Sequence, residues 1–224
     1  MLHSTYHHKE TNEDPKTSAV FENLMLLPDN VFWHILSKSC FSNETMPIHP
    51  GLLISYDFWP HWDRTGTDNT NYVEPDLFLE FELFDVIIEA KYGDYGGQYQ
   101  HQWKQEIIAY HNEYGVEKPF VFIAVGGNQS IVAETITVKG DKVKIYKCNW
   151  LSILMEVNKY QKELESVSMP DLNISATLRL LENIILAFNI NGVYNIDWFN
   201  SMARSVPAIS GTSVENISNL FNWK

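Results

Sequence analysis

The stretch that decides the fold is residues 72–114, which read YVEPDLFLEFELFDVIIEAKYGDYGGQYQHQWKQEIIAYHNEY. Two apolar runs within it meet at residues 82–84, and this pattern predicts a β-hairpin. The second run, residues 85–90, carries β-branched side chains on both faces, which is typical of a central strand rather than an edge strand. A glycine-rich turn follows, and residues 98–114 have the apolar spacing of a helix. The stretch therefore predicts a hairpin, a turn and a helix organised around one central strand.

Charged side chains gather at the open end of this predicted hairpin. Facing residues of a hairpin have numbers with a constant sum, here about 166. Asp76 is therefore expected opposite Ala90, flanked across the ladder by Glu89 and Lys91. Because side chains alternate along a strand, Glu89 and Lys91 also share one face. Two carboxylates and one ammonium are predicted to converge, which would make a metal site with a cation built in.

Such a site suits the hydrolysis of phosphodiesters. Mg²⁺ takes oxygen ligands, usually one or two carboxylates with water and phosphate completing the set. A metal held in this way can lower the pKa of its water and neutralise charge on a phosphate. Lys91 would orient the attacking water or stabilise the developing anion. The alternative is a surface charge pair on an edge hairpin, worth under about 1 kcal/mol.

The residues that carry this chemistry also carry a family resemblance. Pro75-Asp76, a gap of twelve residues and then Glu89-Ala90-Lys91 resembles the motif of the PD-(D/E)XK nuclease superfamily, which has the restriction-endonuclease-like fold. The resemblance covers roughly residues 50–150. It implies that Asp76 and Glu89 bind Mg²⁺ or Mn²⁺ and that Lys91 assists catalysis.

The resemblance also implies accessory residues on the helix that follows. RecB-like members of the superfamily carry a Gln, often with a Tyr, beside the metal. Gln102 is the best match and Gln105 the second, with Tyr110 as a candidate partner. The spacing departs from the usual Gln-x-x-x-Tyr, because the residue four after Gln102 is Glu106. This departure leaves the subfamily open.

Further ligands are candidates upstream of the hairpin. The superfamily often places an acid or a His on a helix before the sheet, where this chain has Glu22 and His34. Glu74 and Asp57 could add carboxylates near the metal. Each of the four has a structural role as its alternative.

An aromatic cluster precedes the motif. Phe58, Trp59 and Trp62 lie beside a polar, turn-rich segment at residues 65–71, and they could form a wall on which bases stack. The alternative, which we favour at this stage, is that the three side chains cap the core.

The rest of the chain predicts an α/β fold with a mixed sheet of about four to six strands, flanked by helices. A flexible tail is expected at residues 1–16, a nuclease-like domain at 17–165 and a helical extension of that domain at 166–224. Strands are predicted near residues 51–58, 119–125, 134–138 and 142–146, and helices near 18–27, 29–40, 150–160, 175–189 and, as a short terminal piece, 196–199.

Composition limits the partners. The chain has 224 residues, of which 45% are hydrophobic, enough for one sizeable core. The N-terminus lacks an apolar secretory segment and no run is long enough to span a membrane. Cys40 and Cys148 are interpreted as reduced core thiols of a cytoplasmic protein. The net charge of −12 gives no large positive field for nucleic acid, so a local basic patch, a partner protein or homodimer, or an unusual substrate would be needed.

The sequence thus predicts a metal-dependent nuclease acting on nucleic acid, DNA rather than RNA, in bacterial or phage defence, restriction or repair. Two alternatives remain open. One is a catalytically silent nuclease fold that serves as a binding or scaffold subunit, which the acidic charge favours and the intact Asp76, Glu89 and Lys91 oppose. The other is an enzyme of unrelated fold whose hairpin matches by chance.

Overall fold

The computed structural model describes residues 13–93, 95–167 and 172–194, which belong to one compact unit, Met1–Tyr194. The predicted terminal helix near residues 196–199 lies outside the described residues. No helix among the described residues is long and apolar enough to cross a membrane. In chain order the elements are α2 (Glu13–Leu24), α3 (Asp29–Ser39), β1 (Leu53–Phe58), β2 (Leu77–Phe81), β3 (Asp85–Ala90), α4 (Gln100–Tyr114), β4 (Phe120–Val125), β5 (Glu134–Val138), β6 (Asp141–Cys148), α5 (Trp150–Glu165) and α6 (Leu172–Ile190).

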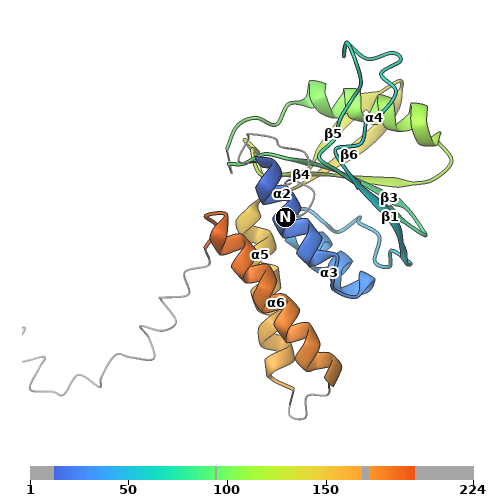
Figure 1. Ribbon diagram of the computed structural model, residues 1–224. Helices are drawn as coiled ribbons and strands as arrows, with labels where there is room; N and C mark the ends of the chain where they lie inside the picture. The colour runs from blue at the N-terminus through green and yellow to red at the C-terminus, as the bar shows by residue number, and fades with distance from the viewer. Residues whose placement is uncertain (1–12, 94, 168–171, 195–224) are drawn as a thin grey trace, which may run out of the picture. The chain divides into compact units, whose positions relative to one another are not determined.

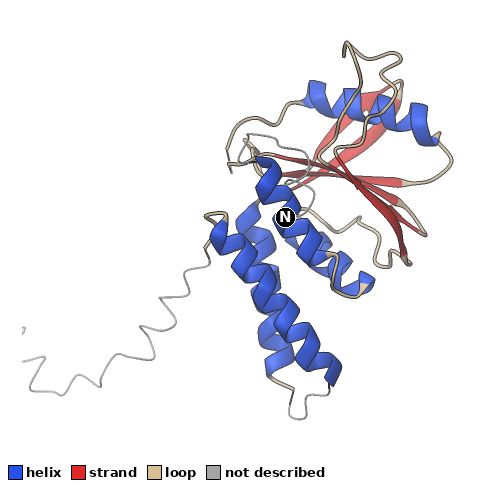
Figure 2. Ribbon diagram, in the orientation of Figure 1, coloured by secondary structure: helices blue, strands red, loops and turns tan. Residues whose placement is uncertain are grey.

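The strands form one mixed sheet of six strands in the order β1-β2-β3-β4-β6-β5. Strands β1, β2 and β3 are antiparallel neighbours, β4 is parallel to both β3 and β6, and β5 returns antiparallel along β6. Helix α4 covers one face of the sheet, while α2, α3, α5 and α6 lie on the other (Figures 1 and 2). The predicted α/β class and the mixed sheet flanked by helices are confirmed.

Strand β3 is central, as its composition predicts. All its residues are buried, and it lies between the antiparallel β2 and the parallel β4. The hairpin turn also falls where it was expected, after Phe81. The register differs by one residue, because Leu77 pairs with Ile88 and Glu80 with Asp85. The paired numbers sum to 165 in place of 166, and the same register continued by one step brings Asp76 opposite Glu89 rather than Ala90.

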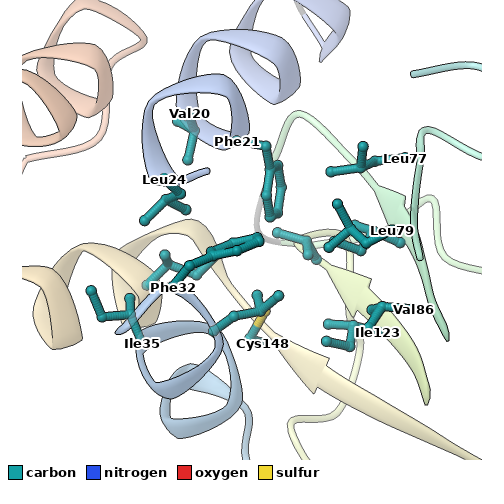
Figure 3. Packing of buried hydrophobic residues seen from close by; sticks show 14 of the residues in the cluster. Val20, Phe21, Leu24, Phe32, Ile35, Leu77, Leu79, Val86, Ile123 and Cys148 are labelled. Atoms are coloured by element: carbon teal, nitrogen blue, oxygen red, sulfur yellow. The ribbon is translucent and has the colours of Figure 1, made fainter. Parts of the chain in front are cut away.

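The alternation of side chains along the strands divides the core in two. The larger cluster lies between the sheet and the helices α2, α3, α5 and α6, and the smaller lies between the sheet and α4. Within β3, Val86 and Ile88 belong to the larger cluster and Ile87 to the smaller, so Glu89 projects from the α4 face. Figure 3 shows members of the larger cluster, among them Val20, Phe21, Leu24, Phe32, Ile35, Leu77, Leu79, Val86, Ile123 and Cys148.

The N-terminal helix begins earlier than its apolar spacing indicates. Helix α2 starts at Glu13, inside the segment expected to be a tail. Asp14 and Lys16 are both buried, and Lys16 Nζ donates a hydrogen bond of 2.9 Å to the carbonyl of Tyr92. These charged side chains hid the first helical turn from a prediction that rests on apolar residues.

Candidate active site

The predicted charged residues meet where β2 begins and β3 ends. Asp76 immediately precedes β2, Glu89 lies near the end of β3 and Lys91 directly follows it. Helix α4 packs over the same face and adds Gln102 and Glu106. Three secondary-structure elements thus contribute to one site.

The Asp76 side chain links the start of β2 to the end of β3 by a hydrogen bond. Its side chain is 7% exposed, and its Oδ2 accepts a hydrogen bond of 2.7 Å from the backbone N–H of Ala90. A hydrogen bond to the ionised form stabilises a carboxylate. Asp76 is therefore held in place at the end of the hairpin where Glu89 also lies.

Glu89 is the centre of the hydrogen-bond network. It is 1% exposed, and its Oε1 accepts hydrogen bonds from Lys91 Nζ and, at 2.5 Å, from Gln102 Nε2. Its backbone carbonyl accepts a further hydrogen bond of 2.9 Å from Gln98 Nε2. The Glu89 carboxylate is thus oriented from the strand, the following loop and α4 together.

Glu106 is the site residue that sequence reasoning missed. It is 1% exposed, and neither carboxylate oxygen accepts a hydrogen bond within the described residues. Burial raises the pKa of Glu106, and Glu89 and Gln102 lie close enough to lower it in part. A signal was available, because residues four apart share one face of a helix and Glu106 follows Gln102 by four.

The buried carboxylates carry more negative charge than their surroundings balance. Burial raises the pKa of Glu106 to about 8, and the nearby charge of Asp76 adds to the effect. Burial also raises the pKa of Glu89 well above its usual range, and the Glu106 charge raises it further while Lys91 lowers it. Three acids share one ammonium, so the site needs bound protons or a bound divalent cation to reach charge balance.

The position of Lys91 is fixed by two glycines. A Cβ on Gly127 would lie 2.7 Å from Lys91 Cβ, and one on Gly97 would lie 3.2 Å from Lys91 Cδ. The backbone is held as well, because Lys91 N–H donates to the carbonyl of Val125 and its own carbonyl accepts from Trp150 Nε1 at 2.8 Å. The lysine stem therefore lies in a narrow channel that directs its ammonium towards Glu89.

The donor set fits a hard divalent cation. Asp76 and Glu89 are two oxygen donors at adjacent strand ends, which is the number of carboxylates that Mg²⁺ sites commonly use. Among residues 13–93, 95–167 and 172–194, no three His, Cys, Asp or Glu side chains are arranged to hold a metal by themselves. Any cation here would therefore need water or substrate oxygen atoms to complete its coordination.

The structure separates the candidates on α4. Gln102 contacts Glu89, whereas Gln105 Oε1 accepts a hydrogen bond of 2.9 Å from the backbone of Asp68. Tyr110 donates a hydrogen bond of 2.8 Å to Asp85, at the opposite end of β3 from Glu89. The expected Gln is in the site, and the expected Tyr partner is not.

Two of the additional candidate ligands lie on the other face of the sheet. Glu22 and His34 are on α2 and α3, the helices that cover the other face of the sheet from Glu89, and His34 is exposed beside Tyr160. Glu74 Oε2 is 2.9 Å from His61 Nε2. Asp76 could be predicted because it belongs to the hairpin motif, whereas Glu22, His34 and Glu74 lie outside that motif.

The first of the two predictions for the aromatic cluster, an exposed wall for base stacking, is wrong. The exposed fractions of Phe58, Trp59 and Trp62 are 2%, 4% and 3%. Phe58 and Trp59 pack in the larger core cluster and Trp62 in the smaller one. These rings are core side chains, which was the alternative favoured from the sequence.

Comparisons with known proteins do not assign this chain to a family. No protein-family model matches this chain. The chain is 26% identical over 210 residues to an uncharacterized protein, PM0110, of Pasteurella multocida (strain Pm70), and the match covers 86% of this chain and 75% of that protein.

Proposed function

We propose that this protein is a metal-dependent nuclease of the PD-(D/E)XK type, with a restriction-endonuclease-like core. The observation that carries the proposal is the convergence of Asp76, Glu89 and Lys91 at one end of the β2–β3 hairpin, with Gln102 bonded to Glu89. The order of elements from α3 through β4 supports it, because it follows the α-β-β-β-α-β arrangement that the resemblance implies.

Asp76 and Glu89 would hold Mg²⁺ or Mn²⁺. When bound, such a cation supplies Lewis-acid neutralisation of the charge that builds on a phosphate. The carboxyl groups of Asp76, Glu89 and Glu106 lie near a single ammonium, and a bound cation would replace the protons that burial otherwise retains there. The site thus has an electrostatic reason to bind a cation.

Lys91 is the proposed catalytic cation. Its Nζ contacts Glu89 Oε1, and an ammonium group has two further N–H donors. These can orient an attacking water and stabilise the negative charge on a phosphate oxygen. Gln102 is a positioning residue, because it fixes the Glu89 oxygen that Lys91 also contacts.

The proposed substrate is nucleic acid, with DNA ahead of RNA, and the proposed setting is bacterial defence, restriction or repair, which a bacterial relative fits. A silent binding or scaffold subunit is the second candidate, favoured by the net charge of −12. An acidic chain gains little non-specific affinity from phosphate contacts, so a partner protein or a second copy would have to supply the affinity.

Cleavage assays separate the two. Labelled single-stranded and duplex DNA and RNA are incubated with Mg²⁺, Mn²⁺ or chelator, using wild type, Lys91→Met and the control Lys104→Ala, which removes a lysine of α4 outside the site. We expect metal-dependent cleavage that falls about 100-fold or more in Lys91→Met and persists in the control. Cleavage by none of the proteins, or equal cleavage by wild type and Lys91→Met, would favour the scaffold.

A further inference from the structure

A polar cavity of about 230 Å³ lies next to the candidate active site. It is formed where β4 and β6 end and β5 begins, at the same end of the sheet as Glu89, and ligands of α/β proteins bind at the carboxyl ends of parallel strands. We propose that this cavity binds a nucleobase, supplied by an unpaired nucleotide of the strand at the active site. Its wall includes Gln98, Trp103, Asn128, Gln129, Glu134 and Lys147.

The charges in the cavity cancel, which favours a neutral ligand group. Lys147 is 2% exposed, its Nζ is paired with Glu134 Oε1, and it lies 5.6 Å from the centre of the Trp103 ring. A second phosphate would meet the Glu134 carboxylate beside this one ammonium. A nucleobase is planar and uncharged, so it avoids that repulsion.

Four further wall residues carry amides, which can both donate and accept hydrogen bonds: Gln98, Gln100, Asn128 and Gln129. Gln129 is exposed and lines the cavity, so its amide is accessible to a ligand. The Nδ2 of Asn128 donates to the carbonyls of Ala124 and Cys148, at 3.0 and 3.1 Å, while its Oδ1 accepts none from the described residues. Side-chain amides read base edges in nucleic acids in this way.

The size of the cavity agrees with one base. A volume of about 230 Å³ is large enough for a planar group of the size of one nucleobase. The amides of the wall would contact the edge of the base that pairing otherwise occupies. The base is therefore proposed to be unpaired, in a single strand or flipped from a duplex.

Gln98 connects the cavity with the active site. Its Nε2 donates to the carbonyl of Glu89 at 2.9 Å, and its Oε1 accepts from Trp103 Nε1 at 2.7 Å. A base in the cavity would thus lie beside the nucleotide whose phosphate is at Glu89. This step rests on the proposed function. Base binding would also help an acidic chain to hold nucleic acid, because base contacts would supplement the weak attraction for phosphates.

The first test measures nucleoside binding to the full chain. Binding is monitored through the indole N–H resonance of Trp103 in NMR spectra. The chain has seven Trp, and Trp103→Phe assigns the resonance. We expect at least one of adenosine, guanosine, cytidine and thymidine to shift it, while ribose and inorganic phosphate do not. Gln129→Ala should weaken binding about tenfold, and Gln161→Ala on α5 should leave it unchanged. No shift with any nucleoside overturns the proposal.

The second test distinguishes a base of the strand from a free nucleotide. A single abasic residue is moved along a cleaved single-stranded oligonucleotide. We expect cleavage to slow about tenfold or more when the abasic residue adjoins the cut, and equal rates at every position would overturn the strand as the source. If no nucleic acid is cleaved yet nucleosides shift the Trp103 resonance, the nuclease proposal fails while base binding by the cavity stands.

Discussion

Gly127 and Lys91 are in direct contact, so closely that a methyl group on Gly127 would lie 2.7 Å from Lys91 Cβ. Gly127 also has a positive φ of 62°, a conformation that glycine adopts at little cost. The loop after β4 thus forms the floor on which the proposed catalytic lysine lies.

Gly127→Ala should therefore displace Lys91. We expect the variant to lose about tenfold or more of any metal-dependent cleavage and to unfold at a lower temperature, because both the φ value and the contact oppose a methyl group. Gly96→Ala is the matched control, since Gly96 has a φ of 77° with nothing within 4 Å of its added Cβ. Cleavage rates of folded protein and thermal melts measure the difference. Equal activity of the two variants would contradict the positioning role of Gly127.

Gln102 and Gln105 allow a second matched comparison on one helix. Gln102→Ala removes the donor to Glu89 Oε1, whereas Gln105→Ala removes the acceptor for the backbone of Asp68. We expect Gln102→Ala to lower kcat by about tenfold and to change the Mn²⁺ concentration that gives half-maximal activity. Gln105→Ala should leave both values unchanged. A kcat reduced equally by both substitutions would mean that neither glutamine has a special relation to Glu89.

Tyr110 provides a test of a residue that lies outside the site. Tyr110→Phe removes the hydrogen bond to Asp85 Oδ2 and leaves a buried carboxylate with its Lys118 ion pair. We expect a loss of about 1–3 kcal/mol in the free energy of unfolding with no change in turnover by folded protein. Tyr95→Phe, at an 88% exposed position, should leave stability unchanged in denaturant titrations. Reduced turnover without reduced stability would place Tyr110 in the catalytic machinery after all.

The hairpin and its site could be predicted because their signals are local. The β-branched run of β3 marks a central strand, and alternation along β3 gives the faces of Glu89 and Lys91. The predicted register was wrong by one residue. The loop between the paired residues Glu80 and Asp85 has an even number of residues, and the apolar pattern does not determine the length of that loop. Local patterns fix faces more reliably than registers.

The missed features depend on tertiary contacts. The spacing of Gln102 and Glu106 places them on one helix face, but only the packing of α4 over the end of β3 makes Glu106 buried. Trp59 and Trp62 lie near a turn-rich segment, and their burial, which we favoured from the sequence, comes from distant core partners. Charged residues inside a core and aromatic residues near loops are therefore the positions where single-sequence reasoning needs a structure.

Glu106 gives the last prediction, which concerns the dependence of stability on pH. Its pKa in the folded protein is raised to about 8 by burial, whereas an exposed Glu has a pKa near 4.3. Below about pH 4 both states hold the proton, so this residue adds no pH dependence. Between these two pKa values the unfolded chain has released the proton and the folded chain retains it. Raising the pH then favours unfolding, with a slope of up to about 1.4 kcal/mol per pH unit.

Glu106→Gln removes this ionisation and keeps the size of the side chain. In metal-free buffer we expect wild type to lose stability from pH 5 to pH 8 more steeply than the variant, as measured by denaturant titration at each pH. Glu117→Gln, at an exposed position, should keep the wild-type slope. Identical slopes for wild type and Glu106→Gln would mean that Glu106 is ionised in the folded protein. The site would then be balanced by a proton on Glu89, whose pKa burial also raises, or by a cation retained in metal-free buffer, because burial makes an unbalanced carboxylate costly.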